Sequence, residues 1–353
     1  MSADAAAAVC ALLRGSPDGP PVPVSGAVVA TAREHRVHLL LAGRVQAPEL
    51  SADRRDAAAL EAVREVELRR VIEGLASAGV PVVIIKGAAL ARTIYPRPEL
   101  RPRLDTDLLI DGSARKPAER VLASLGYVRP VETDGDLCVS QIHFERVDRT
   151  AVRHPIDLHW RISNVLAFAG VLSLEDLARD AVTIPALGPG ALAPSAVHSL
   201  ILACVHRVAH HRDSPHLLWL YDIHLLADAL DDRARDELIA LAAARGVRAV
   251  CADSLRRAGE AFGGHAGELA ARLAPPAGTR EATAAFLAPS RRQVDVLTAD
   301  LRALDGWSKR LQLAREVVFP ARTYMIARYG SRRPLSWLYL QRIVLGAPKW
   351  FRT

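Results

Sequence analysis

Residues 82–110 read VVIIKGAALARTIYPRPELRPRLDTDLLI, in which two apolar runs flank a short alanine-rich stretch. The β-branched run Val82–Ile85 is typical of a buried strand. Lys86-Gly87 then turns the chain into a short segment, Ala88–Tyr95, of helical composition. After a proline-bearing loop, Leu104–Ile110 predicts a second strand. Strand, helix and strand in this order predict a small mixed sheet in this part of the chain.

The sequence on either side of this stretch is mostly helical in pattern. Apolar residues recur at helical spacing, and two alternating segments predict a β-hairpin. The predicted helices cover residues 4–14, 27–46, 52–78 and 114–125, the hairpin strands cover 137–147 and 151–162, and a Gly/Pro-rich connector at 184–195 leads into a helical remainder. We therefore expect an α+β protein, with N-terminal helices at 1–80, a small mixed β-sheet core at 81–190 and a C-terminal helical bundle at 191–353.

The 353-residue chain has a formal charge of +7, and its basic residues are concentrated near the C-terminus. From Arg315 to Thr353 there are eight Lys and Arg against one acid, Glu316, together with seven of the seventeen aromatic residues. Such a tail suits nucleic acid, acidic lipid headgroups or an acidic partner. A closing helical segment with solvated arginines explains it more simply. Nucleic-acid binding is therefore left open but is not favoured.

The cysteines and the N-terminus bear on cellular location. Cys10, Cys138, Cys204 and Cys251 form no CxxC pair, so the sequence predicts neither a zinc site nor a disulfide framework. The N-terminal apolar stretch is short and has no charged region before it, and no run reaches transmembrane length. We expect a cytoplasmic protein with reduced thiols and no transmembrane segment.

The strongest chemical signal is the carboxylate pair Asp105 and Asp107. Side chains alternate along a strand, so both carboxylates project from one face, with their Cα atoms about 6.5 Å apart. Two acids on an apolar strand repel each other and lose hydration, and one or two divalent cations can compensate for both effects. A pair of solvated acids at a strand end is the simpler alternative. The choice between a metal site and solvated acids therefore depends on the neighbouring motifs.

Two further motifs favour a site for phosphate and metal. Lys86 and Gly87 stand between a strand and a helix, where glycine lets the backbone approach a phosphate and the helix N-terminus favours an anion. In HPIDLHW, residues 154–160, Asp157 and His159 alternate with apolar residues and share a strand face. A third carboxylate there can complete a metal site or accept a hydroxyl proton. An ordinary turn and a half-buried strand are the structural alternatives.

Together these motifs resemble the polymerase-β-like nucleotidyltransferase superfamily, and more closely its bacterial branch of uncharacterised nucleotidyltransferase-family proteins. The pattern of that branch is an apolar strand ending in Lys-Gly, a small-residue helix ending in Tyr, a loop with Arg and then Asp-x-Asp, and residues 82–110 match it throughout. DLHW at 157–160 and CVHRVAHHRDSPHLLWLYDIHLLADAL at 204–230 are also similar to the branch. Gly87-Ala88 departs from the Gly-Ser or Gly-Gly of the wider superfamily, so no serine hydroxyl is available for a phosphate there.

The resemblance implies that residues 81–190 are a nucleotidyltransferase catalytic core. The reaction would be Mg²⁺- or Mn²⁺-dependent transfer of a nucleoside monophosphate, with ATP as the expected donor, to a hydroxyl-bearing acceptor, with release of pyrophosphate. By position, the catalytic residues and metal ligands would be Asp105, Asp107 and Asp157. The nucleotide contacts would be Lys86, Gly87, Arg101 and His159. Whether Asp157 is a metal ligand or the base is left open.

The sequence does not identify the acceptor, which could be a small molecule or natural product, a protein side chain or, as for toxin-type transferases, an RNA end. A catalytically silent nucleotide- or partner-binding protein on the same fold is the alternative, and the retention of all three carboxylates argues against it. His206, His210 and His211 follow one another on a predicted helix, where packing or facing the cleft is favoured over a zinc site. Asp222, in an apolar run, is expected to be a buried hydrogen-bonding acid.

Overall fold

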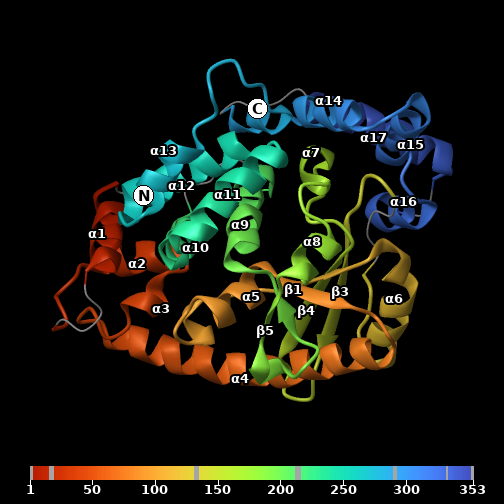
Figure 1. Ribbon diagram of the computed structural model, residues 1–353. Coiled ribbons are helices and arrows are strands. Elements are labelled where there is room, and N and C mark those ends of the chain that lie inside the picture. The colour runs from red at the N-terminus through yellow and green to blue at the C-terminus, as the bar shows by residue number, and fades with distance from the viewer. Residues whose placement is uncertain are drawn as a thin grey trace.

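The computed structural model describes residues 3–15, 20–130, 135–210, 216–288, 292–330 and 333–350 (Figure 1). Within these ranges the strands form one six-stranded sheet in the order β3-β4-β2-β1-β6-β5. The strands are β1 (Val82–Ile85), β2 (Thr106–Ile110), β3 (Gln141–Val147), β4 (Arg153–His159), β5 (Val182–Thr183) and β6 (Leu192–Ala193). The β2–β4 and β1–β6 pairs are parallel and the other three are antiparallel, so the sheet is mixed, as the sequence predicts.

Helices precede the sheet, connect its strands and follow it, which confirms the α+β class. Before the sheet come α1 (Ala3–Arg14), α2 (Gly26–Glu34), α3 (His38–Leu41) and α4 (Pro48–Ser77). Between strands lie α5 (Lys86–Thr93), α6 (Arg115–Ser124), α7 (Leu166–Ala169) and α8 (Leu174–Arg179). After the sheet come α9 (Ala196–His210), α10 (Leu217–Ala229), α11 (Asp232–Ala244), α12 (Arg248–Phe262), α13 (Ala266–Leu273), α14 (Gln293–Ala303), α15 (Trp307–Val318), α16 (Arg322–Tyr329) and α17 (Leu335–Trp350).

Both faces of the central strands are covered by helices, which is why β1 and β2 are buried along their whole length. Val82 and Ile84 belong to a core shared with α4 and α6, whereas Val83 and Ile85 belong to a core shared with α9. Figure 1 shows the long helix α4 on one side of the sheet and α9 to α13 on the other. The strand period of two therefore assigns alternate residues to two different cores.

The single helix predicted for residues 27–46 is wrong. The chain forms α2 and α3 instead, and between them Arg36 adopts a left-handed backbone conformation with φ 56°. Hydrogen bonds from the backbone N–H of Arg36 to Arg33 O (3.0 Å) and of Val37 to Ala32 O (2.9 Å) close the end of α2. Apolar periodicity continues through this turn, so the pattern did not reveal the break.

The connector predicted for residues 184–195 also contains more structure than expected. Its end forms β6, which pairs with β1 through Val83 and Leu192, and β5 pairs with β6. Strands of two residues are too short to produce a recognisable alternation. These two strands extend the sheet on the side away from the hairpin.

The N-terminal helices do not pack against the sheet alone. Val9, Leu13 and Leu41 share a core with Leu218 of α10 and Phe262 of α12. The divisions at residues 80 and 190 remain a prediction. None of the helices in the described ranges has the combination of length and hydropathy that crossing a bilayer requires.

Candidate active site

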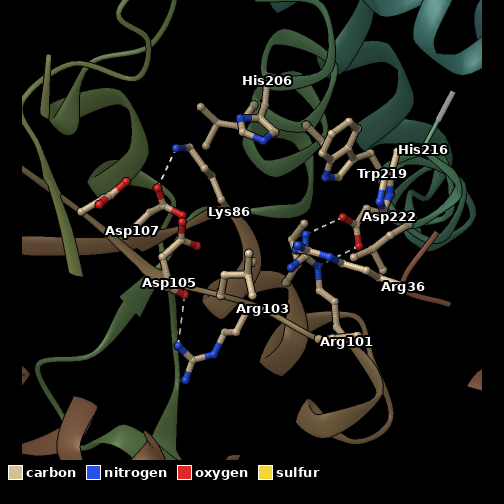
Figure 2. A pocket seen from close by; sticks show the side chains of 18 of the residues that line it. Arg36, Lys86, Arg101, Arg103, Asp105, Asp107, His206, His216, Trp219 and Asp222 are labelled. Carbon is tan, nitrogen blue, oxygen red and sulfur yellow. Dashed lines mark hydrogen bonds and ion pairs between the residues drawn. The ribbon is translucent and has the colours of Figure 1, made fainter. Parts of the chain in front are cut away.

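A cavity of about 540 Å³ lies on the face of the sheet that α9 and α10 cover. Six of the seven residues that the sequence assigned to the site line it: Lys86, Gly87, Arg101, Asp105, Asp107 and Asp157. The seventh, His159, is buried behind Asp107, with its Nε2 2.8 Å from Asp107 Oδ1. Figure 2 shows Asp105 and Asp107 side by side, with Lys86 directed at Asp107. Residues far apart in the sequence therefore meet at one place.

The sheet register brings the carboxylates together. Asp107 of β2 is paired with Asp157 of β4 in a parallel ladder, while their neighbours Leu108 and Leu158 point into the opposite core. The strand begins at Thr106 rather than at the predicted Leu104, so Asp105 lies just before β2. Its backbone carbonyl accepts a hydrogen bond from Arg103 Nη1 at 3.2 Å.

Asp107 has the most strongly perturbed electrostatic environment of the site. It is 4% exposed, and burial alone would raise its pKa. The Lys86 ammonium, 2.6 Å from Oδ1, and the hydrogen bond from His159 outweigh burial, so the pKa of Asp107 falls well below its ordinary value. Burial and the charge of Lys86 lower the pKa of His159. The neutral imidazole donates from Nε2 to Asp107, and its buried Nδ1 finds no hydrogen-bond partner in the described chain.

Lys86 acts as an internal counter-ion for this carboxylate cluster. Its backbone has φ 53°, a left-handed conformation that costs a non-glycine residue about 1 kcal/mol. The conformation occurs where β1 turns into α5, and the Lys86 ammonium lies between Asp107 and His159, 3.4 Å from His159 Nε2. Local strain of this kind is concentrated at functional sites. A bound cation would have to share Asp107 with Lys86 or displace its ammonium.

Asp157 is held by two residues of β3 that the sequence analysis missed. Gln141 Nε2 donates to Oδ2 at 2.7 Å, and His143 Nδ1 lies 2.8 Å from Oδ1. Both side chains project from the polar face of the predicted hairpin, and His143 pairs with Asp157 in the register. The alternation of Gln141 and His143 in the sequence was the available signal. This alternation shows that both side chains lie on one face of the hairpin, but it does not show that they contact the carboxylate of Asp157.

The tightest metal-binding arrangement differs from the predicted one. Ligand atoms of Asp107, Asp157 and His159 lie within 4.8 Å of one another, a spacing that one cation can bridge. Asp105 stands outside this group, yet burial first, and then the charges of Asp107 and Asp157, raise its pKa to about 6. The carboxylate oxygens suit Mg²⁺ or Mn²⁺, whereas an imidazole ligand is more typical of transition metals such as Zn²⁺ or Fe²⁺. The donor set therefore fits a divalent cation, and the predicted ligand role of Asp105 remains a prediction.

Asp105→Asn is expected to stabilise the metal-free protein at pH 8 by about 3 kcal/mol. The pKa of Asp105 rises from 3.8 to about 6, so between these pH values the folded state binds more protons than the unfolded state. The free energy of unfolding therefore falls as pH rises through this window, and the loss persists above it. Urea denaturation with EDTA at pH 5 and pH 8 measures the effect. Equal stability of wild type and variant at pH 8 would contradict the burial of an ionised Asp105.

Arg101 forms a buried ion pair, and its predicted contact with phosphate remains a prediction. Its Nε and Nη2 donate to Asp222 of α10 at 2.9 Å and 2.6 Å, and Tyr95 Oη donates to the same carboxylate at 2.7 Å. Asp222 is thus the buried hydrogen-bonding acid that the sequence predicts. Arg101 Nη1 makes no hydrogen bond within the described residues and points at Gly87, where a Cβ would lie 2.5 Å from it. One donor of the guanidinium therefore remains available at the cavity wall.

Gly87→Ala is expected to destabilise the protein by about 1–3 kcal/mol, because the new methyl group collides with Arg101 Nη1. The guanidinium cannot turn aside freely, since Asp222 holds it through two hydrogen bonds. Gly170→Ala is the matched control, because no atom lies within 4 Å of its Cβ position and its φ is −99°. Thermal unfolding of both variants measures the difference. A Gly87→Ala protein as stable as the control would show that Arg101 is mobile.

The opposite wall of the cavity comes from α9, α10 and the turn at Arg36. The ring of Trp219 stacks on His216, with centroids 4.6 Å apart, and meets His206 edge-on at 6.0 Å. His206 therefore faces the cleft, which was one of the two roles favoured for it from the sequence, the other being packing between helices. His210 ends α9, and His211 lies outside the described residues. Arg36 was missed because its placement depends on the left-handed turn after α2.

A family model described as uncharacterised nucleotidyltransferase matches residues 23–263 of the chain. Neither the curated proteins nor the solved structures contain a significant match. Every residue that lines the cavity lies inside the matched range. Because the match covers more than half of the 353 residues, the chain belongs to the family of uncharacterised nucleotidyltransferases.

Proposed function

We propose that the protein transfers a nucleoside monophosphate from a nucleoside triphosphate to a hydroxyl group of an acceptor, and that this reaction takes place in the cavity. The expected nucleoside monophosphate is AMP. The observation that carries this proposal is the meeting of Asp105, Asp107 and Asp157 beside the start of α5. Three carboxylates that share a cavity with a strand-to-helix turn suit a cation and a phosphate at the same place.

The charges that line the cavity support a polyanionic substrate. Four cationic side chains, Arg36, Lys86, Arg101 and Arg103, stand against four carboxylates, Asp105, Asp107, Asp157 and Asp222. The lining is therefore formally neutral, and each divalent cation adds two positive charges. A nucleoside triphosphate supplies the opposite charge. Arg36 lines the cavity and makes no side-chain hydrogen bond or ion pair within the described residues, so its guanidinium is available to a phosphate.

The proton of the attacking hydroxyl has a route out of the cavity. In the proposed reaction Asp157 accepts this proton, and His143, which contacts Asp157 Oδ1 and is 30% exposed, passes it to solvent. Lys86 and Arg101 Nη1 stabilise charge on the phosphates. Asp107, with Asp105 or Asp157 and with His159 in the tautomer whose Nε2 carries no proton, would hold Mg²⁺ or Mn²⁺, which when bound stabilises the leaving pyrophosphate.

The acceptor would approach from the wall that α9 and α10 provide. Trp219, His216 and Leu218 give this wall an aromatic and apolar character that phosphates do not need. A hydroxyl-bearing small molecule, natural product or protein side chain fits it better than an RNA end, whose recognition would need a basic surface here.

Incubation of the purified protein with each α-labelled nucleoside triphosphate and Mg²⁺ or Mn²⁺, with pooled small molecules or extract as acceptors, tests the proposal. Label transfer and pyrophosphate release are expected in the wild type and not in Asp105→Ala/Asp107→Ala. Nucleotide binding by calorimetry separates the alternatives. Metal-dependent binding without transfer would favour a silent nucleotide-binding protein, and absence of binding for every nucleotide would overturn the proposal.

A further inference from the structure

Helices α15 and α17 present large apolar side chains to solvent. The exposed fractions are 76% for Trp307, 67% for Leu311, 47% for Trp337, 51% for Leu340 and 60% for Val344. In the described residues between Val182 and Trp307, no large hydrophobic side chain is exposed in this way. Leu345 of α17 is also 56% exposed. Scattered single exposures need no explanation, but a concentration of six in two helices of one region does.

Three of the four exposed large apolar residues of α17 form one stripe, and the fourth is Leu345. Trp337, Leu340 and Val344 follow one another at spacings of three and four, which places them on one side of a helix, while Leu338 is fully buried. Arg333 lies one turn before Trp337, with its guanidinium 5.5 Å from the indole centroid, and both residues line an open depression. The helix therefore has two apolar faces, one packed and one exposed, and arginine borders the exposed one.

The packed face fixes α17 within the protein. Tyr339 Oη donates to Pro320 O at 2.8 Å, Arg342 Nη2 donates to Val317 O at 3.2 Å, and Phe319 meets Tyr339 edge-on at 5.3 Å. These contacts join α17 to the end of α15 and the start of α16. The exposed stripe is consequently carried by a folded unit, which Figure 1 shows at the end of the molecule away from α4.

The charge of this region is almost entirely of one sign. From Trp307 to Thr353 the sequence has ten Lys and Arg and a single acid, Glu316. The Glu316 carboxylate turns inward, where it accepts hydrogen bonds from the backbone N–H of Leu137 at 2.9 Å and of Cys138 at 3.0 Å. It therefore does little to neutralise the outer surface.

We propose that the exposed stripe of α17, formed by Trp337, Leu340 and Val344 with Arg333 beside it, binds an anionic phospholipid membrane. Tryptophan and arginine side by side suit the headgroup level of a bilayer, and aliphatic residues between them enter the acyl boundary. Basic residues add electrostatic attraction to anionic lipid. Nucleic acid would use the arginines but would leave Leu340 and Val344 without an apolar partner. Since no described helix can span a bilayer, the association is peripheral.

Sedimentation of the full chain with vesicles of phosphatidylcholine, with and without phosphatidylglycerol, tests this proposal. Binding is expected only where phosphatidylglycerol is present, and it should weaken as salt rises. Trp337→Ser/Leu340→Ser/Val344→Ser should lower binding at least about tenfold, because the apolar contribution is lost. Arg333→Gln should lower it about fivefold, the factor expected for one basic residue near an anionic surface.

The matched control is Val63→Ser/Val66→Ser/Val147→Ser, which removes exposed apolar side chains from α4 and β3. This variant should bind vesicles like the wild type. Equal binding to both kinds of vesicle, no binding to either, or triple and control variants that behave alike would each overturn the proposal. Binding to RNA together with failure to bind vesicles would assign the basic surface to nucleic acid instead. Circular dichroism verifies folding, and Arg333→Gln keeps the test valid if the triple variant is unstable.

Discussion

Asp107→Asn should lower nucleotide transfer by about 10² to 10³ fold, the loss expected when one preorganised charge-stabilising group is removed. Asp107 is the most closely bound carboxylate of the cluster: Lys86 and His159 bond to it, and the register pairs it with Asp157. Asparagine keeps the shape but removes the charge that would hold a divalent cation. Measurement of pyrophosphate release against Mg²⁺ or Mn²⁺ concentration should show a lower maximum rate and a higher metal requirement.

Asp111→Asn is the matched control for this prediction. Asp111 follows β2 directly, accepts a hydrogen bond from the backbone N–H of Ser113 at 2.8 Å, and does not line the cavity. The same chemical change four residues along the chain should leave transfer unchanged. If both variants kept wild-type rates, Asp107 would have no part in catalysis, and the cation would have to bind elsewhere.

The site residues that could be predicted from the sequence are those whose position follows from the two-residue alternation of side chains along a strand. Asp157 and His159 alternate with apolar neighbours, and the two-residue spacing of Asp105 and Asp107 assigns both to one face, although Asp105 lies just before β2. Gln141 and His143 show the same alternation on β3. Their contact with Asp157 depends on the pairing of two strands, and residue types within one strand do not specify that pairing.

Arg36 and Arg101 illustrate what the sequence could not supply. Arg36 reaches the cavity because a left-handed residue ends α2 inside a continuous apolar pattern. The resemblance assigned Arg101 to the phosphates by position, and this role remains a prediction, but its main partner in the structure, Asp222, is 121 residues away. Attraction between charges depends on distance in space, so a basic residue near a motif is assigned correctly only when its competing acids are known.

The Arg101–Asp222 ion pair leads to the largest expected change in stability. Both side chains are almost fully buried, and Asp222→Asn would leave the guanidinium without a counter-charge. Breaking a buried pair by neutralising one member costs about 3–5 kcal/mol. Urea denaturation at pH 7 measures this loss. Asp232→Asn is the control, because its carboxylate is 95% exposed, and an ion pair such as it forms with Arg235 contributes little.

A double variant separates the effect of the buried charges on stability from the contribution of Arg101 to nucleotide binding. Arg101→Met/Asp222→Leu removes both charges and should recover a large part of the stability lost in Asp222→Asn, because an apolar pair carries no desolvation cost. Recovery should be incomplete, since Tyr95 Oη also donates to Asp222 and would lose its acceptor. If Arg101 Nη1 contacts phosphate, the double variant should fold well and yet have a raised KM for the nucleoside triphosphate. A stable double variant with unchanged KM would make Arg101 purely structural, leaving Lys86 and Arg36 as the phosphate contacts.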